Sequence, residues 1–322
     1  MWQRLFFYVS VILAFNADAD CPSDMRAKTV SITLGLDIGE MNAGFSPLRG
    51  VQDDANYYKE LSDSFASRKA LVSADLLNSM HANKQTFLAS MQKTIGNAQY
   101  VNFNYVGHAV QTANCEWAFV LPSAPSVLMQ SCSSLFKSDP STKCAKAAPR
   151  KPSVKCSELD QYIVTASDLK AVFAGKKVFG INDSCFSGAA DFGADSYMVN
   201  SARGSQGAHD QFGFSQYLKK VALSPYGCAL DKNHDGQINF AEFANSLKPQ
   251  QATGKKRCFI GSIAFTVATG NCPDGTSNQS LGQEQDPTVT GKSGDWAQCF
   301  LLSTGSQCQP GEEPAALDAV SD

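Results

Sequence analysis

Two apolar stretches of the chain stop abruptly at residues that can carry out nucleophilic chemistry. Residues 100–108 read Tyr-Val-Asn-Phe-Asn-Tyr-Val-Gly-His and end at His108, and residues 178–188 read Val-Phe-Gly-Ile-Asn-Asp-Ser-Cys-Phe-Ser-Gly and contain Cys185. A thiol is a strong nucleophile as its thiolate, which a neighbouring imidazole favours, and the imidazole then protonates a leaving amine. If two strands deliver these residues to one edge of a sheet, they form the dyad of a cysteine hydrolase.

Strand and helix patterns alternate along the chain. Residues 29–39 alternate small or polar with apolar side chains, as a strand does, whereas residues 53–66 and 84–95 carry apolar side chains on one helical face. Ser167 is expected to cap a short helix before the second apolar stretch. This alternation predicts an α/β fold with a mostly parallel central sheet flanked by helices on both faces. Ligands of such sheets bind beyond the carboxyl ends of the strands, where both candidate residues fall.

The N-terminus predicts export. Arg4 precedes an apolar run at 5–15, and Ala-Asp-Ala follows at 17–19, which is typical of a secretory signal peptide over residues 1–19. The mature protein is then expected to be secreted or periplasmic, with no membrane association after cleavage. The alternative is an uncleaved membrane tether.

The length allows one α/β domain or two small ones, and the lack of an internal repeat or a clear linker favours a single catalytic domain. The chain has 322 residues with a net charge of −3, so neither nucleic acid nor an acidic membrane surface is indicated as a partner. We expect this catalytic domain over 26–305, a polar, cysteine-rich loop at 121–156 within it, and a flexible tail at 309–322. The sequence does not indicate an oligomeric state.

The cysteines are odd in number. There are eleven, and disulfides are expected in an exported chain, so setting Cys185 aside leaves ten that can form up to five bridges. These ten are Cys21, Cys115, Cys132, Cys144, Cys156, Cys228, Cys258, Cys272, Cys299 and Cys308. The alternative is that another cysteine is unpaired and Cys185 is bridged.

Residues 231–242 fit the twelve-residue calcium loop of an EF-hand. Such a loop supplies oxygen ligands at fixed positions around a glycine at position 6, which here is Gly236. The candidate ligands are Asp231, Asn233, Asp235, Gln237, Asn239 and Glu242. The spacing predicts one bound Ca²⁺.

This loop looks like half of an EF-hand inside the domain. A helix is expected to leave it over 239–247, but Pro225 and Gly227 interrupt any helix directly before it. We interpret the predicted ion as a structural clip for the C-terminal part of the domain. A regulatory switch is the alternative.

Several short motifs, taken in order, resemble those of the caspase-like peptidases, and most closely the metacaspases and their exported bacterial relatives of the p20 type. The runs that carry the resemblance are Leu-Arg-Gly-Val-Gln-Asp-Asp-Ala at 48–55, Tyr-Val-Gly-His at 105–108, Asp-Ser-Cys-Phe-Ser-Gly at 183–188, Asn-Ser-Ala-Arg-Gly-Ser-Gln at 200–206, Gly-Phe-Ser at 213–215 and Gln-Asp-Pro at 285–287. The resemblance extends from the first strand to about residue 300.

The resemblance implies a role for each matching residue. Cys185 would be the nucleophile and His108 the general acid and base. The backbone N–H groups of Cys185 and Ala109 would stabilise the oxyanion, and Gly188 would let backbone approach the substrate. Asp54 and Asp183 fall where metacaspases place the two carboxylates of the pocket for the residue before the cut. Such a pocket favours Arg or Lys.

The chain departs from the family pattern at four positions. Ala109 stands where the family has Gly, Val106 replaces a pocket Ser, Val51 replaces a frequent Cys, and Phe186 replaces a frequent His. The pocket is therefore more apolar than is typical.

The sequence thus predicts a secreted cysteine endopeptidase that cuts protein or peptide substrates after Arg or Lys. One alternative has the same fold cutting after Asn or Asp. The other is a catalytically silent, calcium-binding homologue that acts as a binding protein.

Overall fold

The computed structural model places most of the predicted catalytic domain. It describes residues 21–37, 47–63, 65, 68–71, 79–112, 114–132, 154–204, 214–218, 231, 236–247, 256–260, 263–267, 272 and 286–302. The predicted signal peptide and tail, most of the cysteine-rich loop, and the candidate ligands Asn233 and Asp235 lie outside these residues.

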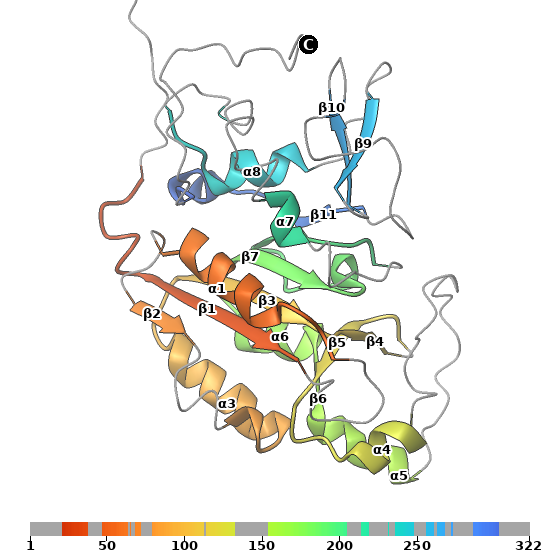
Figure 1. Cartoon of the computed structure of the whole chain (residues 1–322). Coiled ribbons are helices and arrows are strands. Elements are labelled where there is room, and N and C mark those ends of the chain that lie inside the picture. Colours follow the sequence, from red (N-terminus) through yellow and green to blue (C-terminus); the bar gives the residue numbers. More distant parts are fainter. Residues whose placement is uncertain are drawn as a thin grey trace, which may run out of the picture.

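A six-stranded sheet forms the centre of the described chain (Figure 1). Its strands, in spatial order, are β11 (Thr288–Gly291), β8 (Ser196–Asn200), β7 (Lys177–Ser184), β3 (Tyr100–Gly107), β1 (Thr29–Leu36) and β2 (Arg68–Leu71). All neighbouring strands are parallel except β11, which runs antiparallel to β8. The prediction of an α/β fold with a mostly parallel sheet is therefore confirmed.

Two smaller antiparallel sheets accompany the central one. The first joins β4 (Val110–Gln111), β5 (Trp117–Val120) and β6 (Ile163–Thr165). The second joins β9 (Lys256–Ile260) and β10 (Ile263–Val267). The first begins directly after β3, so it lies close to the position of His108.

Most of the described helices pack into two apolar clusters that share strands of the central sheet, whereas α4 and α5 belong to a third cluster. The described helices are α1 (Val51–Leu61), α3 (Lys84–Ile95), α4 (Ser126–Ser131), α5 (Val154–Ser157), α6 (Ala166–Val172), α7 (Phe214–Tyr217) and α8 (Phe240–Ser246), with 3₁₀ turns η2 (Glu158–Tyr162), η3 (Ser187–Ala189) and η6 (Asp295–Cys299). Phe179 and Ile181 of β7 pack with residues of α1, α7 and α8, whereas Val178 packs with residues of α3 and α6. Because successive strand side chains point to opposite faces, these two clusters occupy the two faces of β7.

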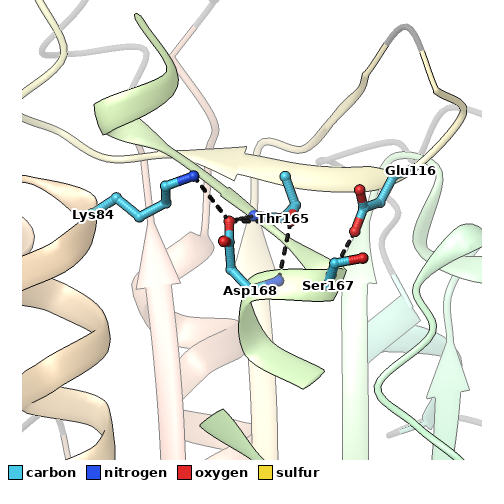
Figure 2. A network of polar contacts seen from close by, with 5 residues as sticks. All are labelled: Lys84, Glu116, Thr165, Ser167 and Asp168. Carbon is cyan, nitrogen blue, oxygen red and sulfur yellow. Dashed lines mark hydrogen bonds and ion pairs between the residues drawn. The ribbon is translucent and has the colours of Figure 1, made fainter. Parts of the chain in front are cut away.

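A capping network fixes the start of α6 (Figure 2). Thr165 Oγ1 accepts from the Asp168 N–H (3.1 Å), and the Asp168 carboxylate accepts from the Thr165 N–H (2.9 Å), which is a capping box. Lys84 of α3 pairs with the same carboxylate at 3.2 Å. The prediction that Ser167 is the cap is wrong, because Ser167 lies in the first turn and its backbone N–H donates to Glu116.

Disulfides join distant parts of the described chain. The bridges Cys21–Cys299, Cys132–Cys156 and Cys258–Cys272 are present, and Cys115 is also disulfide-bonded. Of the eight described cysteines, only Cys185 remains a thiol. Such bridges indicate an oxidising, extracellular-type environment. Among the helices that the structure describes, none has the length and apolar character needed to cross a membrane.

The cap assignment predicts that Thr165→Ala lowers the free energy of unfolding by about 1 kcal/mol, because the Asp168 N–H at the start of α6 loses its acceptor. Thr165→Ser keeps the hydroxyl and should recover most of this loss in a urea titration. Ser167→Ala should change little. A larger effect of Ser167→Ala than of Thr165→Ala would contradict the cap.

Candidate active site

The strand register brings His108 and Cys185 to the same edge of the central sheet. β3 and β7 are adjacent and parallel, and Gly107, the last residue of β3, pairs with Ser184, the last residue of β7. His108 and Cys185 are the next residue of each chain segment, and both are half-buried. The two residues therefore leave neighbouring strands at the same level of the carboxyl edge, as the sequence predicted.

The backbone turns sharply on both sides of this pair. Phe186, directly after Cys185, has a φ of +59°, a left-handed conformation that is costly for a bulky residue. Gly107, directly before His108, has a φ of +145°, and a Cβ there would lie 2.2 Å from the Leu36 carbonyl oxygen. Both turns end their strands at once, so His108 and Cys185 stand beyond the sheet.

The backbone residues expected to hold an oxyanion have different surroundings. Ala109 is buried in the cluster against which Cys185 packs. The N–H of Gly188 donates to the Ala202 carbonyl at 2.9 Å, and a Cβ on Gly188 would lie 2.8 Å from the Gly204 nitrogen. The close approach that requires glycine at 188 is therefore to the chain itself, and its N–H already has an acceptor.

The two candidate pocket carboxylates lie together on the α1 face of the sheet. Asp183 of β7 is buried and accepts a hydrogen bond from the Tyr58 hydroxyl of α1 at 2.6 Å. Asp54, four residues before Tyr58 on the same helix, accepts from the Ser215 hydroxyl of α7. The charge of Asp54 also acts on Asp183. The two residues that sequence analysis grouped as a pocket are thus brought together.

Burial dominates the electrostatics of Asp183. Desolvation, together with the negative charge of Asp54, raises the pKa of Asp183 from 3.8 to about 6, although hydrogen bonds from Tyr58 and Ser201 lower it. Burial and the charge of Asp183 raise the pKa of Tyr58 well above its ordinary value, so Tyr58 stays a neutral donor. Near neutral pH the site therefore contains a buried carboxylate whose charge is only partly compensated.

The residues that surround Asp183 on the α1 face of the sheet are mostly apolar. Val51 and Val106, the residues that replace polar ones of the family pattern, are both buried in the cluster that contains Tyr58. They lie on the same face as Asp183. A long side chain with an apolar stem and a charged end suits such surroundings.

Segments that are far apart in the sequence converge around this edge. Gln111 of β4 donates to the Gly204 carbonyl at 3.1 Å, and Ser187 donates to the Ala202 carbonyl at 3.2 Å. Arg203 pairs with Asp286 at 3.3 Å. The described parts of three motif runs, residues 183–188, 200–204 and 286–287, therefore meet at one place.

Sequence reasoning assigned no role to four residues that contact the site, although three of them lie within the quoted motif runs. They are Tyr58, Tyr105, Ser201 and Ser215. Tyr58 follows Asp54 by one helical turn, and Tyr105 shares a strand face with Gly107, so periodicity places each of them near a known candidate. Periodicity alone does not tell which neighbour a hydroxyl contacts.

The described part of the candidate calcium loop has the expected backbone. Gly236 has a φ of +85°, and its N–H donates to the Asp231 carboxylate at 2.9 Å, which closes the loop from position 6 back to position 1. Asn239 and Glu242 form a capping box at the start of α8. The predicted exiting helix is therefore present.

The loop is joined to the end of the described chain. Ile238 accepts from the Leu302 N–H at 2.9 Å, the Phe240 N–H donates to the Phe300 carbonyl at 2.8 Å, and Asn239 forms an antiparallel bridge with Leu301. No group of three or more His, Cys, Asp or Glu side chains able to hold a metal occurs among the described residues, which exclude Asp235. Of the predicted ligands that are described, Asp231 and Glu242 carry carboxylates, whereas Gln237 and Asn239 offer amide or backbone oxygens.

Comparison of the chain with protein-family models, with curated proteins and with solved structures found no match. Any assignment of function to this chain therefore rests on its residues and their geometry.

The raised pKa of Asp183 predicts a pH-dependent stability difference. Because the folded protein holds the Asp183 proton more tightly than the unfolded chain, the free energy of unfolding should fall as pH rises from about 4 to 6, by on the order of 3 kcal/mol. Asp183→Asn, which keeps an acceptor for Tyr58 but no charge, should lack this fall in urea titrations.

Asp191→Asn is the control for this comparison. The exposed Asp191 pairs with Lys170 at 2.9 Å, and hydrogen bonding to Lys170 lowers its pKa. Because this shift is opposite to that of Asp183, Asp191→Asn should remove a small rise, not a fall, in the free energy of unfolding with increasing pH. Parallel stability curves for the wild type and Asp183→Asn between pH 4 and 7 would show that burial of Asp183 carries no energetic cost.

Proposed function

We propose that the protein is a secreted, caspase-like cysteine endopeptidase in which Cys185 and His108 form the catalytic dyad. The observation that carries the proposal is the register of β3 and β7, which pairs Gly107 with Ser184 and so sets the two residues side by side at the carboxyl edge. The thiol state of Cys185 among disulfide-bonded cysteines supports it. The left-handed residue directly after Cys185 is a strained position of the kind that clusters at active sites.

The proposed reaction uses the dyad twice. The Cys185 thiolate attacks the carbonyl carbon of the scissile peptide bond, and the backbone N–H groups of Cys185 and Ala109 stabilise the oxyanion. His108 gives its proton to the leaving amine, and an acyl-enzyme thioester remains. His108 then removes a proton from water, the hydroxide attacks the thioester, and the acid product leaves as Cys185 becomes a thiolate again.

The carboxylates of Asp54 and Asp183 support a preference for Arg or Lys before the scissile bond. A buried carboxylate with a raised pKa gains most from a cationic partner, because the cation compensates its charge where water does not. The apolar Val51 and Val106 suit the stem of such a side chain. An Asp side chain in this place would meet two groups of its own charge, so cleavage after Asp is disfavoured.

The second part of the proposal is one Ca²⁺ in the 231–242 loop. The contact of Gly236 with Asp231 and the left-handed backbone at Gly236 are features that an EF-hand loop needs before it can surround an ion. Asp231, Asn239 and Glu242 would supply side-chain oxygens, and Gln237 its carbonyl oxygen. The bond from Leu302 to Ile238 favours a clip that fastens 300–302 to the loop.

A panel of fluorogenic peptides that differ only in the residue before the cut tests the peptidase. The wild type should cleave Arg and Lys peptides at least roughly 100-fold faster than Asn, Asp or Ala peptides, because only cations compensate the buried carboxylate. Cys185→Ala should abolish all cleavage. Asp183→Asn should reduce cleavage after Arg while Cys185 still reacts with iodoacetamide.

The panel also separates the rival functions. Preferential cleavage after Asn or Asp would replace the basic pocket with the other specificity. No cleavage of any peptide by a preparation whose Cys185 is a thiol by mass spectrometry would favour a silent binding protein.

Calcium should raise the melting temperature of the wild type relative to excess chelator. At 100 times the dissociation constant the stabilisation is about 2.7 kcal/mol, or roughly 4 °C for a chain of this size. Glu242→Gln keeps a cap for α8 but removes one ligand charge, so it should lose most of this shift. Unchanged kcat in both conditions is expected of a clip, whereas a kcat that follows calcium would make the ion a switch.

A further inference from the structure

Tyr105 lies beneath the proposed dyad and contacts it through its hydroxyl. The side chain is only 1% exposed, and its hydroxyl donates to the carbonyl oxygen of His108 at 2.5 Å. The hydroxyl therefore reaches past Gly107 and ties the residue after β3 to the strand itself. Glycine is the most flexible residue of the backbone, and Gly107 has a positive φ. The hydrogen bond from Tyr105 therefore restrains the backbone directly after Gly107.

The Tyr105 ring has little freedom to move. It stacks on Phe119 of β5 at 5.0 Å between ring centroids, and it meets Trp117 edge-on at 5.2 Å. Both partners are fully buried. Because the packed ring restricts the position of its hydroxyl, the hydrogen bond also restricts the position of the His108 carbonyl relative to β5.

The same aromatic cluster also holds the strand that carries Cys185. Trp117 Nε1–H donates to Ser184 Oγ at 3.0 Å, and the Ser184 hydroxyl donates to Asn182 Oδ1 at 2.7 Å. Ser184 is the residue directly before Cys185. Tyr105 and Trp117, which touch each other, thus hold the backbone of one dyad residue and the neighbour of the other.

Tyr105 is also close enough to Cys185 to feel its charge. Burial, and then a negative charge on Cys185, raise the pKa of Tyr105 well above its ordinary value. The phenol therefore remains a neutral donor to His108 when the sulfur is a thiolate. Its hydrogen bond persists through the step in which the dyad is charged.

We propose that Tyr105 is the positioning residue of the dyad, which holds the His108 backbone at the distance from Cys185 that nucleophilic attack requires. The proposal rests on the peptidase function proposed above. In this proposal Tyr105 positions only the dyad. Tyr58, a buried tyrosine that donates to Asp183, acts only on the proposed specificity pocket. The two hydroxyls therefore have separable roles.

Tyr105→Phe removes the hydroxyl and keeps the ring. We expect kcat on an Arg peptide to fall by roughly 10–100-fold with KM within about twofold, because a misplaced catalytic group slows the chemistry without weakening substrate binding. The preference for Arg over Ala peptides should stay unchanged. The pH at which Cys185 is half-maximally alkylated by iodoacetamide should rise by about one unit, since a displaced imidazole stabilises the thiolate less.

Two further tyrosine variants control the experiment. Tyr58→Phe should leave the alkylation profile unchanged and lower kcat/KM for Arg peptides. The acid limb of the pH dependence of kcat/KM should move to higher pH, because the Tyr58 hydrogen bond lowers the pKa of Asp183 and its loss raises that pKa. Tyr162→Phe alters a tyrosine that packs against the third apolar cluster, which contains neither His108, Cys185 nor Tyr105, and should match the wild type in every readout.

Phe119→Leu covers the case in which Tyr105→Phe does not fold. It keeps the hydroxyl but loosens the ring, so it should shift kcat and alkylation in the same direction by a smaller amount. If folded Tyr105→Phe or Phe119→Leu keeps kcat within twofold and the wild-type alkylation profile, the positioning role is overturned.

The alkylation readout separates this inference from the peptidase proposal. A wild type that cleaves no peptide, but whose Cys185 reacts at lower pH than that of Tyr105→Phe, would remove the proposed function and leave the positioning role standing. If an active wild type and Tyr105→Phe have equal alkylation profiles, the positioning role of Tyr105 is overturned and the peptidase proposal stands.

Discussion

The parallel pairing of β3 with β7 is the constraint on which the site depends. A shift of one residue between them would move every side chain of β7 to the opposite face and separate the ends that carry His108 and Cys185. Buried polar groups fix the register. Asn104 Oδ1 accepts from the Ile181 N–H at 3.0 Å, while its amide donates to Ser62 of the loop after α1 at 3.0 Å. A slipped strand would leave these groups buried without partners, at a cost of roughly 1–3 kcal/mol each.

Because side chains of β7 alternate between the two faces of the sheet, the proposed specificity residue and the support of the proposed nucleophile lie on opposite faces. Asp183 points to the α1 face, where Tyr58 and the charge of Asp54 set its properties, whereas Ser184 points to the face of β5 and is held by Trp117. A single strand thus supplies the proposed specificity group and the support of the proposed nucleophile. Because the two sets of contacts lie on opposite faces, either can change with little disturbance of the other.

Local sequence patterns predicted the sheet and the ends of its strands. They did not predict the contacts between segments that are distant in the sequence. The apolar stretches that stop at His108 and Cys185 were readable because a buried parallel strand is nearly continuous in hydrophobicity. The cap of α6 was misplaced by two residues, since Thr165 and Ser167 are both good caps and the choice depends on Asp168 and Glu116. The bond from Tyr58 to Asp183 spans 125 residues, and no local pattern encodes it.

The position of the candidate calcium loop argues for a clip that acts on the pocket side of the sheet. Phe240, the first residue of α8, meets Phe179 of β7 at 5.3 Å, and Phe300 stacks on the same ring at 4.0 Å. The segment around Phe300 is fastened both by its bonds to the loop and by the Cys21–Cys299 disulfide. Phe179 shares its face with Asp183, four residues further along the strand. A Ca²⁺ ion bound in this loop would therefore stabilise the face of the sheet that carries the buried carboxylate of Asp183. The aromatic residues that support the proposed dyad, Tyr105 and Trp117, pack on the opposite face.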